Sequence, residues 1–402
     1  MKIVGINAVN TGSTGNIMLQ IADEARKSGM EVLICVPKSR SNMKKKCEGQ
    51  FQFGDCMTRN LHILLAKFTG FQDCFSVIAT SHLLKRITAF EPDVIHLHNL
   101  HGNYINLPMI FHYIVKHNIP VVWTLHDCWS FTGQCPYFTM IKCKKWKTGC
   151  HECPQIDKYP SSRVDRTKIM WKLKRKWFSG VKKMTIVTPS GWLASLVKES
   201  YLKEYPVMVI NNGIDLDIFK PTASDVREKY GLKNKFIVLG VAFSWEVRKG
   251  LDIFIKMAKR LDSRYQIVLI GTNHEIDKKL PKNIISIHRT ANQRELAEIY
   301  TVADVFVNPT REENYPTVNM ESIACGTPVI TFNTGGSPEI LDENTGYVVD
   351  VDDVDEMERQ IIRICTNSAL YVEKCLNKAH EFDQREKYKE YLELYKSILG
   401  DC

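Results

Sequence analysis

The chain has 402 residues, more than one ordinary hydrophobic core accommodates, so two domains of about 200 residues each are expected. Its composition, 44% hydrophobic and 25% charged, is that of a globular protein and excludes a disordered or fibrous chain. The net charge of +9 is concentrated, because residues 142–183 hold fourteen Lys or Arg and only three Asp or Glu.

The N-terminus lacks the charged, apolar and small-residue succession of a signal peptide. No stretch approaches the roughly 18 uninterrupted apolar residues that a membrane span needs. We therefore expect a cytoplasmic protein. In that compartment the thirteen cysteines are expected to remain thiols or to bind metal rather than to form disulfides.

The first half alternates β-branched runs with amphipathic helical segments. The predicted helices cover about 16–28, 108–117 and a segment from Trp192 to Glu199 that Ser190 could cap. The predicted strands are Lys2–Val9, Glu31–Pro37, Val94–Leu97, Val121–Leu125, Thr185–Thr188 and Val207–Ile210.

A polar stretch with Gly and Pro, Asn211–Pro221, is suited to a linker, and the same alternation restarts after it. The predicted strands of the second half are Phe236–Val241, Gln266–Ile270, Ile284–His288, Asp304–Val307 and Pro328–Thr331. The predicted helices are Gly250–Leu261, Gln293–Val302 and Val318–Cys325.

This alternation predicts an α/β protein with two Rossmann-like domains that face each other across a cleft. The N-terminal domain is expected over 1–212, with an insertion at about 128–183, and the C-terminal domain over 213–402. The ligand is expected in the cleft, at the carboxyl ends of the strands. Apolar residues at helical spacing predict a tail helix that packs back on the body: Tyr388, Tyr391, Leu392, Tyr395 and Leu399.

Gly12 and Gly15 lie in the turn that follows the first strand. Glycines let a backbone approach a phosphate, and the N–H groups at a helix start can bind it. The full G-x-G-x-x-G pattern of dinucleotide-binding proteins is missing, and the second strand ends without an acidic residue for a ribose. A donor contact and a tight strand-to-helix turn both fit this motif.

The strongest motif of the second half contains two carboxylates eight residues apart, Glu313 and Glu321. Between them, the free N–H groups around Thr317 and Val318 begin a helix and could bind a diphosphate. A carboxylate can accept two hydrogen bonds from vicinal sugar hydroxyls. We therefore interpret Glu313 as a contact of a hexose and Glu321 as a contact of a ribose.

The E-x₇-E pattern, the run Ala324–Ile330 and the later Gly335–Glu339 together resemble the retaining family 4 glycosyltransferases of the GT-B fold. The resemblance covers nearly the whole chain. It implies a glycosyltransferase that needs no cofactor for catalysis and that moves a hexosyl group from a nucleoside diphosphate to a glycan hydroxyl. Capsule, lipopolysaccharide or other polysaccharide assembly is the implied setting.

In that family, a basic pair near the position of Arg248 and Lys249 binds the donor diphosphate, and Gly250 permits close approach. A planar guanidinium fork and a compact ammonium suit these contacts. Many members also have an arginine several residues earlier, roughly where Phe243 stands here. Arg248 could substitute for it, and a solvated basic turn is the simpler alternative.

His126 closes a strand and is expected to point into the cleft. In the family a histidine at this place lies beside the donor sugar, where its carbonyl or ring can stabilise positive charge. Glu313 and His126 are therefore the residues expected at the reacting centre, and an oxocarbenium-like transition state would depend on electrostatics and orientation. His96, His98, Asn99 and His101 follow the preceding strand and could contact the acceptor or be plain polar packing.

Four cysteines fall within nineteen residues: Cys135, Cys143, Cys150 and Cys153. Four thiolates could hold a structural zinc ion, with no open position for catalysis. The spacing is not that of a standard zinc ribbon, so free thiols stand as the alternative.

The same insertion is basic, and five of the seven tryptophans of the chain lie between Trp123 and Trp177. The segment Trp171–Phe178 could lie on an anionic membrane at the inner face, which would fit an acceptor linked to polyprenyl diphosphate. Alternatively it is a solvated helix whose tryptophans belong to the core. A nucleic acid partner is not expected.

Two other functions remain compatible with these residues. A nucleotide-sugar epimerase of the same architecture would need acid and base groups at the sugar ring and no acceptor. A zinc-containing protein that binds polyanions or membranes would use the Rossmann-like domains only as a scaffold, which leaves the motif around Glu313 unexplained.

Overall fold

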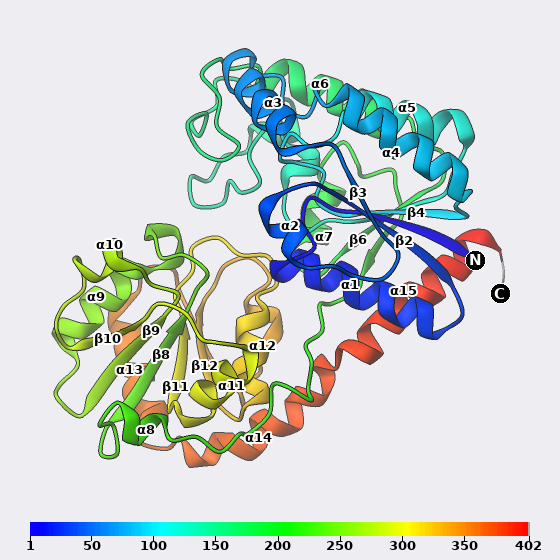
Figure 1. Cartoon of the computed structure of the whole chain (residues 1–402). Coiled ribbons are helices and arrows are strands. Elements are labelled where there is room, and N and C mark those ends of the chain that lie inside the picture. The colour runs from blue at the N-terminus through cyan, green and yellow to red at the C-terminus, as the bar shows by residue number, and fades with distance from the viewer. Residues whose placement is uncertain (401–402) are drawn as a thin grey trace. The chain divides into compact units, whose positions relative to one another are not determined.

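The structure, a computed structural model, describes residues 1–400 and divides into two compact units. The N-terminal unit contains residues 1–211 and the tail from Arg385 onward, and the C-terminal unit contains residues 212–384. Each unit is a parallel sheet covered by helices (Figure 1). No helix among residues 1–400 is long and apolar enough to cross a bilayer.

The sheet of the N-terminal unit has seven parallel strands in the order β3-β2-β1-β4-β5-β6-β7. The strands are β1 (Lys2–Ile6), β2 (Glu31–Pro37), β3 (Gln50–Phe53), β4 (Val94–Leu97), β5 (Val121–Thr124), β6 (Met184–Thr188) and β7 (Val207–Val209). The side chains of the five central strands are largely buried on both faces, as a sheet between two helical layers requires, whereas the edge strands β3 and β7 are partly exposed. β3 is the one strand of this sheet that the sequence did not predict.

The helices of this unit form two layers. α1 (Gly12–Lys27) and α15 (Gln384–Leu399) share one hydrophobic core with the first sheet face. The opposite face is covered by α4 (Val77–Phe90), α5 (Leu107–His117), α6 (Thr167–Phe178) and α7 (Gly191–Lys198). Two further helices, α2 (Arg40–Lys44) and α3 (Cys56–Thr69), lie in the connections.

The C-terminal unit has a six-stranded parallel sheet in the order β10-β9-β8-β11-β12-β13. Its strands are β8 (Phe236–Val241), β9 (Tyr265–Ile270), β10 (Ile284–Ile287), β11 (Val305–Asn308), β12 (Val329–Phe332) and β13 (Gly346–Val349). Its helices are α8 (Val226–Lys229), α9 (Leu251–Arg260), α10 (His274–Asp277), α11 (Gln293–Val302), α12 (Thr317–Ala324), α13 (Val354–Cys365) and α14 (Ala369–Ala379). The prediction of two Rossmann-like α/β domains is confirmed.

The first strand is shorter, and the first helix longer, than predicted. β1 ends at Ile6 instead of Val9, and α1 begins at Gly12 instead of Asn16. Asn10 leaves the sheet because its side chain is buried and bonds the backbone of Asn42 and Lys45. A Cβ at Gly15 would lie 2.6 Å from the backbone of Asn10, so only glycine lets α1 start this close to the turn.

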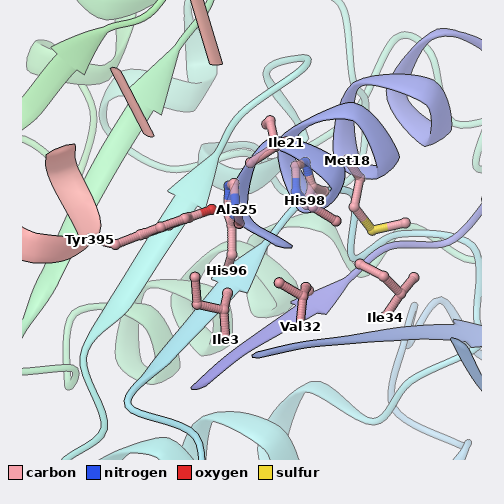
Figure 2. Close-up of a pocket in the computed structure, with 11 residues that line it drawn as sticks. Ile3, Met18, Ile21, Ala25, Val32, Ile34, His96, His98 and Tyr395 are labelled. Atoms are coloured by element: carbon pink, nitrogen blue, oxygen red, sulfur yellow. Dashed lines mark hydrogen bonds between the residues drawn. The ribbon is translucent and has the colours of Figure 1, made fainter. Parts of the chain in front are cut away.

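The tail helix packs on the N-terminal unit, whereas the prediction included it in the C-terminal domain. α15, red in Figure 1, lies beside α1 and buries Tyr388, Tyr391 and Tyr395 against the sheet. Figure 2 shows Tyr395 extending toward His96. Their hydroxyl and Nδ1 are 2.6 Å apart, and His96 Nε2 lies 2.8 Å from the Thr124 hydroxyl.

This hydrogen-bond chain makes His96 a structural residue. The Thr124 hydroxyl donates to Tyr391, so His96 donates from Nε2 to Thr124 and accepts at Nδ1 from Tyr395. Burial, together with the nearby His126, lowers the pKa of His96 to about 3, so the ring is neutral. The aromatic spacing of the tail predicts an apolar face, but it does not reveal that this face carries a hydroxyl for His96.

Replacing Tyr395 by Phe should destabilise the protein by about 1–3 kcal/mol, because His96 Nδ1 would be left buried without its partner. Tyr113→Phe is the matched control, since the Tyr113 hydroxyl contacts Thr88 at an exposed position. Thermal unfolding of the three proteins checks this expectation. Equal midpoints for the Tyr395 and Tyr113 variants would show that the buried bond does not stabilise the tail.

Candidate active site

In the C-terminal unit, the candidate site forms where the neighbouring strands β8 and β11 end. The loop after β8 contains the short turn η3 (Val247–Lys249), and the loop after β11 leads to α12. Gly250 has a φ of 75°, and a Cβ there would lie 2.3 Å from the Pro309 carbonyl oxygen. This glycine therefore lets the two loops touch.

Three of the predicted donor residues meet at this contact. Lys249 Nζ lies 2.6 Å from Glu313 Oε2, and both side chains are about four-fifths buried. The Arg248 guanidinium reaches the Glu312 carbonyl at 3.4 Å, while the Arg248 carbonyl accepts from the Arg311 N–H at 2.8 Å. Two basic side chains thus lie near Glu313, and Arg248 also pairs with the exposed carboxylate of Glu246 at 3.0 Å.

Glu313 is ionised. Burial alone would raise its pKa, but the Lys249 ammonium, the Asn314 N–H and Arg248 together hold the pKa below its ordinary value. A carboxylate in this state accepts hydrogen bonds and can bind hydroxyl groups. The loop itself is fixed by Gly335, where a Cβ would lie 1.8 Å from the Glu313 carbonyl oxygen, and by Gly336, whose N–H donates to Asn314.

Arg311 supports this loop, and the sequence reasoning missed it. Its buried guanidinium binds both oxygens of Asp252, at 2.8 Å each, and also contacts Asp352. These carboxylates lie on α9 and after β13. Because buried charges are rarely stable unpaired, the pairing fixes the start of the Glu313 loop. The sequence signal that could have indicated this role is an arginine directly before Glu312 and Glu313.

Glu321 lies on α12, one helical turn after the first residue, Thr317. It accepts a hydrogen bond from the Tyr300 hydroxyl at 3.3 Å and another from the Thr317 side chain. Burial raises the pKa of Glu321 to about 7. Thr317 and Val318 form the first turn of α12, where no side chain caps the free N–H groups. The positions of Thr317, Val318 and Glu321 therefore agree with a helix start that could bind an anion.

In the N-terminal unit, His126 follows β5 and is buried. Its Nε2 lies 3.1 Å from His98 Nδ1, and the two rings stack with centroids 5.4 Å apart. Burial lowers the pKa of His126 to about 4, so the imidazole is neutral near pH 7. A small pocket at the ends of β4 and β5 is lined by both histidines and by Asp127.

Asp127 and His101 form an ion pair that the sequence reasoning missed. Their Oδ2 and Nε2 atoms are 3.0 Å apart, and Tyr159 approaches His101 Nδ1 at 2.9 Å. Although burial opposes both charges, the partners lower the pKa of Asp127 and raise that of His101. Of the histidines considered for the acceptor side, His98 and His101 line this pocket. His96 instead binds the tail helix.

The other predicted residues lie elsewhere. Gly12, with a φ of 69°, and Gly15 form the first turn of α1, where the packing of Gly15 on Asn10 accounts for a tight turn. Trp171 is buried, as are Lys174 and Phe178, so this face of α6 belongs to the core. The core interpretation of the tryptophans of the basic segment therefore holds for Trp171. Cys135, Cys143, Cys150 and Cys153 line one separate pocket of the N-terminal unit.

Sequence comparisons agree with both halves of this description. The profile described as "Glycosyltransferase Family 4" matches residues 14–218, about half of the chain, and "Glycosyl transferases group 1" matches residues 233–367. A protein of Escherichia coli K12, assigned as the colanic acid biosynthesis glycosyl transferase WcaC, is 28% identical over 65% of this chain and 65% of its own length.

A second relative is the Escherichia coli UDP-Gal:α-D-GlcNAc-diphosphoundecaprenol α-1,3-galactosyltransferase, 28% identical over 45% of this chain and 51% of its own. This chain thus spans between half and two thirds of the length of these two relatives. Among solved structures, the sucrose-phosphate synthase of Thermosynechococcus elongatus superimposes over the full length of both chains with a TM-score of 0.74 and 16% identity, which supports the GT-B fold. With the family profile matched over half of its length, the chain belongs to glycosyltransferase family 4.

Proposed function

We propose that this protein transfers a hexosyl group from a nucleoside-diphosphate sugar to a hydroxyl of a lipid-linked glycan during cell-surface polysaccharide assembly. The names of its relatives support this setting, since one is assigned to colanic acid biosynthesis and another uses UDP-Gal and a diphosphoundecaprenol-linked sugar. The structural support is the cluster of Arg248, Lys249 and Glu313 beside the start of α12.

In the proposed donor complex, the diphosphate binds Arg248, Lys249 and the N–H groups of Thr317 and Val318. Two cations and a helix start are the groups that proteins use for phosphates. Lys249 already neutralises Glu313, so one ammonium would bridge the carboxylate and the diphosphate. Glu313 then accepts hydrogen bonds from hexose hydroxyls.

The proposed reaction retains the anomeric configuration. The acceptor oxygen bonds to the sugar C1 on the face from which the C1–O bond to the diphosphate breaks. The acceptor proton passes to the departing phosphate oxygen, so no side chain need act as a general base. A neutral His126 suits this scheme, because its ring or carbonyl can stabilise the positive charge that develops on the sugar.

We also propose a peripheral contact with an anionic membrane, at α3 rather than at α6. α3 has fourteen residues, of which only Ala66 is buried. Met57, Leu61 and Leu64 are 83%, 53% and 50% exposed, and they repeat at helical spacing along one apolar face. Exposed apolar faces of this kind mark interaction surfaces.

Basic residues of the insertion lie beside this helix and favour an anionic bilayer over an apolar protein groove. The Arg163 guanidinium lies 4.6 Å from the centre of the Phe68 ring, and the Arg163 N–H donates to the Lys67 carbonyl. Arg166 contacts the turn at Gly70. An apolar helix with cationic neighbours is typical of peripheral membrane contact.

Glu313→Gln and Arg248→Ala should each lower the rate of sugar transfer by at least about 100-fold, because both remove preorganised charge from the proposed donor site. Glu343→Gln is the control, since Glu343 is an exposed glutamate of the same unit. Release of nucleoside diphosphate from a panel of nucleotide sugars, with and without membrane-extracted acceptor, measures the activity. Full transfer by both site variants would contradict the assignment, and conversion of the donor sugar without acceptor would indicate an epimerase.

Glu321 gives a pH-dependent expectation. The pKa of Glu321 is raised to about 7 in the folded protein. The folded protein therefore loses stability as the pH rises from the ordinary carboxyl pKa to about 7, and the loss is complete above that pH. Glu321→Gln should therefore stabilise the protein at pH 8 by roughly 1–3 kcal/mol and leave its stability near pH 4.5 unchanged. Thermal unfolding at both pH values measures the difference. A variant that is equally or less stable at pH 8 would disprove this ionisation behaviour.

Leu61→Glu with Leu64→Glu should reduce binding to vesicles that contain anionic lipid by at least about tenfold, because two charges would enter the apolar face. Leu370→Glu is the matched control, with 68% exposure on α14. Co-sedimentation at low and high salt measures binding, which salt should weaken. Unchanged binding of the double variant, or no binding of the unmodified protein, would exclude α3 as the membrane contact.

A further inference from the structure

The connection between β5 and α6 is long and almost without regular structure. Over residues 125–166 it contains only two single turns of 3₁₀ helix, η1 (Trp129–Phe131) and η2 (Lys145–Lys147). Segments of this length without helices or strands are uncommon in compact domains. The connection nevertheless has an interior, where Phe138 stacks on Trp146 with ring centres 5.0 Å apart. Such a segment requires an additional constraint to hold its aromatic residues in place.

Four thiols of this connection line a single pocket: Cys135, Cys143, Cys150 and Cys153. The thiols of Cys135 and Cys153 are hydrogen-bonded to each other. Backbone N–H groups also point at sulfur. The Gly133 N–H donates to Cys150 Sγ at 3.2 Å, and the Gln155 N–H donates to Cys153. These contacts place backbone donors beside two of the four sulfurs.

The backbone at the C-x₂-C pair is folded into a tight turn. Glu152, between the two cysteines, has a φ of 42°, a conformation that a non-glycine residue adopts only where the surroundings hold it. Lys145 holds it, because its ammonium donates to the carbonyls of His151 and Glu152, at 3.0 Å each. At Gly133, a Cβ would lie 2.9 Å from the Cys150 Cβ, so only glycine lets this part of the connection pack against Cys150.

The charges around the pocket are also suited to an anionic sulfur cluster. Lys174 of α6 is fully buried and donates to the carbonyls of Trp129 and Thr132. Among residues 1–400 no carboxylate lies within ion-pair distance of its ammonium. Cys135 and Cys150 are near enough to interact with it electrostatically. Burial lowers the pKa of Lys174 to about 7, while Asp73, Cys150, Asp127 and Cys135 favour its charged form. Added negative charge on the cysteines would therefore stabilise this buried ammonium.

We propose that Cys135, Cys143, Cys150 and Cys153 bind one structural zinc ion that fixes this connection. Binding would release the four thiol protons, and the resulting site would carry two negative charges opposite Lys145 and Lys174. Tetrahedral zinc needs sulfur atoms about 3.8 Å apart, given Zn–S bonds of about 2.3 Å. Among the described residues, no three of these sulfurs lie within 4.8 Å of one another. The side chains must therefore rotate toward a common centre as the ion binds.

This zinc site would also position the pocket around His126. Asp127 lies near the start of the connection and accepts from the Trp129 N–H at 2.8 Å. Its far end returns through Tyr159 to His101. The proposal does not depend on the proposed glycosyl transfer, because metal content can be measured on protein of any activity.

Zinc content of the full-length protein, purified under reducing conditions, tests the proposal. We expect about one zinc ion per chain by elemental analysis. Cys150→Ser and Cys153→Ser should lower it to the level of the buffer blank. Cys47→Ser is the matched control, because a serine hydroxyl can replace the bond from the half-buried Cys47 thiol to Gln50.

The variant Asp277→Asn is a second control. His274, Asp277 and His288 form a cluster of potential ligands on the C-terminal unit, with Asp277 Oδ2 2.6 Å from His288 Nε2. Two of the three residues are exposed, and no other observation indicates a metal there. Zinc that persists in Asp277→Asn but not in Cys150→Ser would support the cysteine site. The reverse pattern would overturn it.

Cobalt substitution keeps the test informative if a cysteine variant does not fold. Co²⁺ added to the chelator-treated unmodified protein should produce the sulfur-to-cobalt charge-transfer absorption of tetrahedral thiolate coordination. It should also raise the thermal midpoint that the chelator had lowered. Absence of that absorption, or a disulfide between Cys135 and Cys153 in the freshly purified protein, would overturn the proposal.

Discussion

The order of the strands is the constraint on which the candidate residues of each unit depend. β8 and β11 are adjacent in their sheet, so the loops at their carboxyl ends meet although Lys249 and Glu313 are 64 residues apart in sequence. The same rule acts in the other unit, where adjacent strands β4 and β5 bring His98 beside His126 and His101 beside Asp127. Parallel sheets place loops at one edge, and neighbouring strands decide which loops touch.

Sequence patterns predict this arrangement well where the chemistry is local. The alternation of strands and helices, the helix start after Glu313 and the glycines at 250, 335 and 336 are visible in the sequence, and the structure gives each a physical role. The partners of charged residues are harder to predict. Arg311 binds Asp252 and Asp352, which are distant in sequence, and no local spacing links them.

The tail helix and α6 show a second limit of sequence patterns. Amphipathic spacing predicts that α15 has a buried face, but it does not indicate which of the two units this face packs against. The face packs on the N-terminal unit, where Tyr395 bonds His96, a side chain 299 residues away. In α6, a lysine stands on the buried face, which charge patterning alone would assign to solvent. Lys174 is tolerated there because its ammonium lies over the Trp129 ring and binds carbonyl oxygens.

These observations assign different roles to the aromatic and the basic residues of the tryptophan-rich insertion. Its aromatic residues build an interior for a connection that has no strands, and its cations divide between the surface and that interior. Arg163 lies on Phe68 of the exposed helix α3, whereas Lys174 lies under the loop that carries the four cysteines. Under the two proposals made above, this positively charged segment has two partners of negative charge, an anionic bilayer at the surface and a thiolate cluster in the interior. Because screening by salt weakens interactions at the surface far more than in the interior, ionic strength should affect only the first of these contacts.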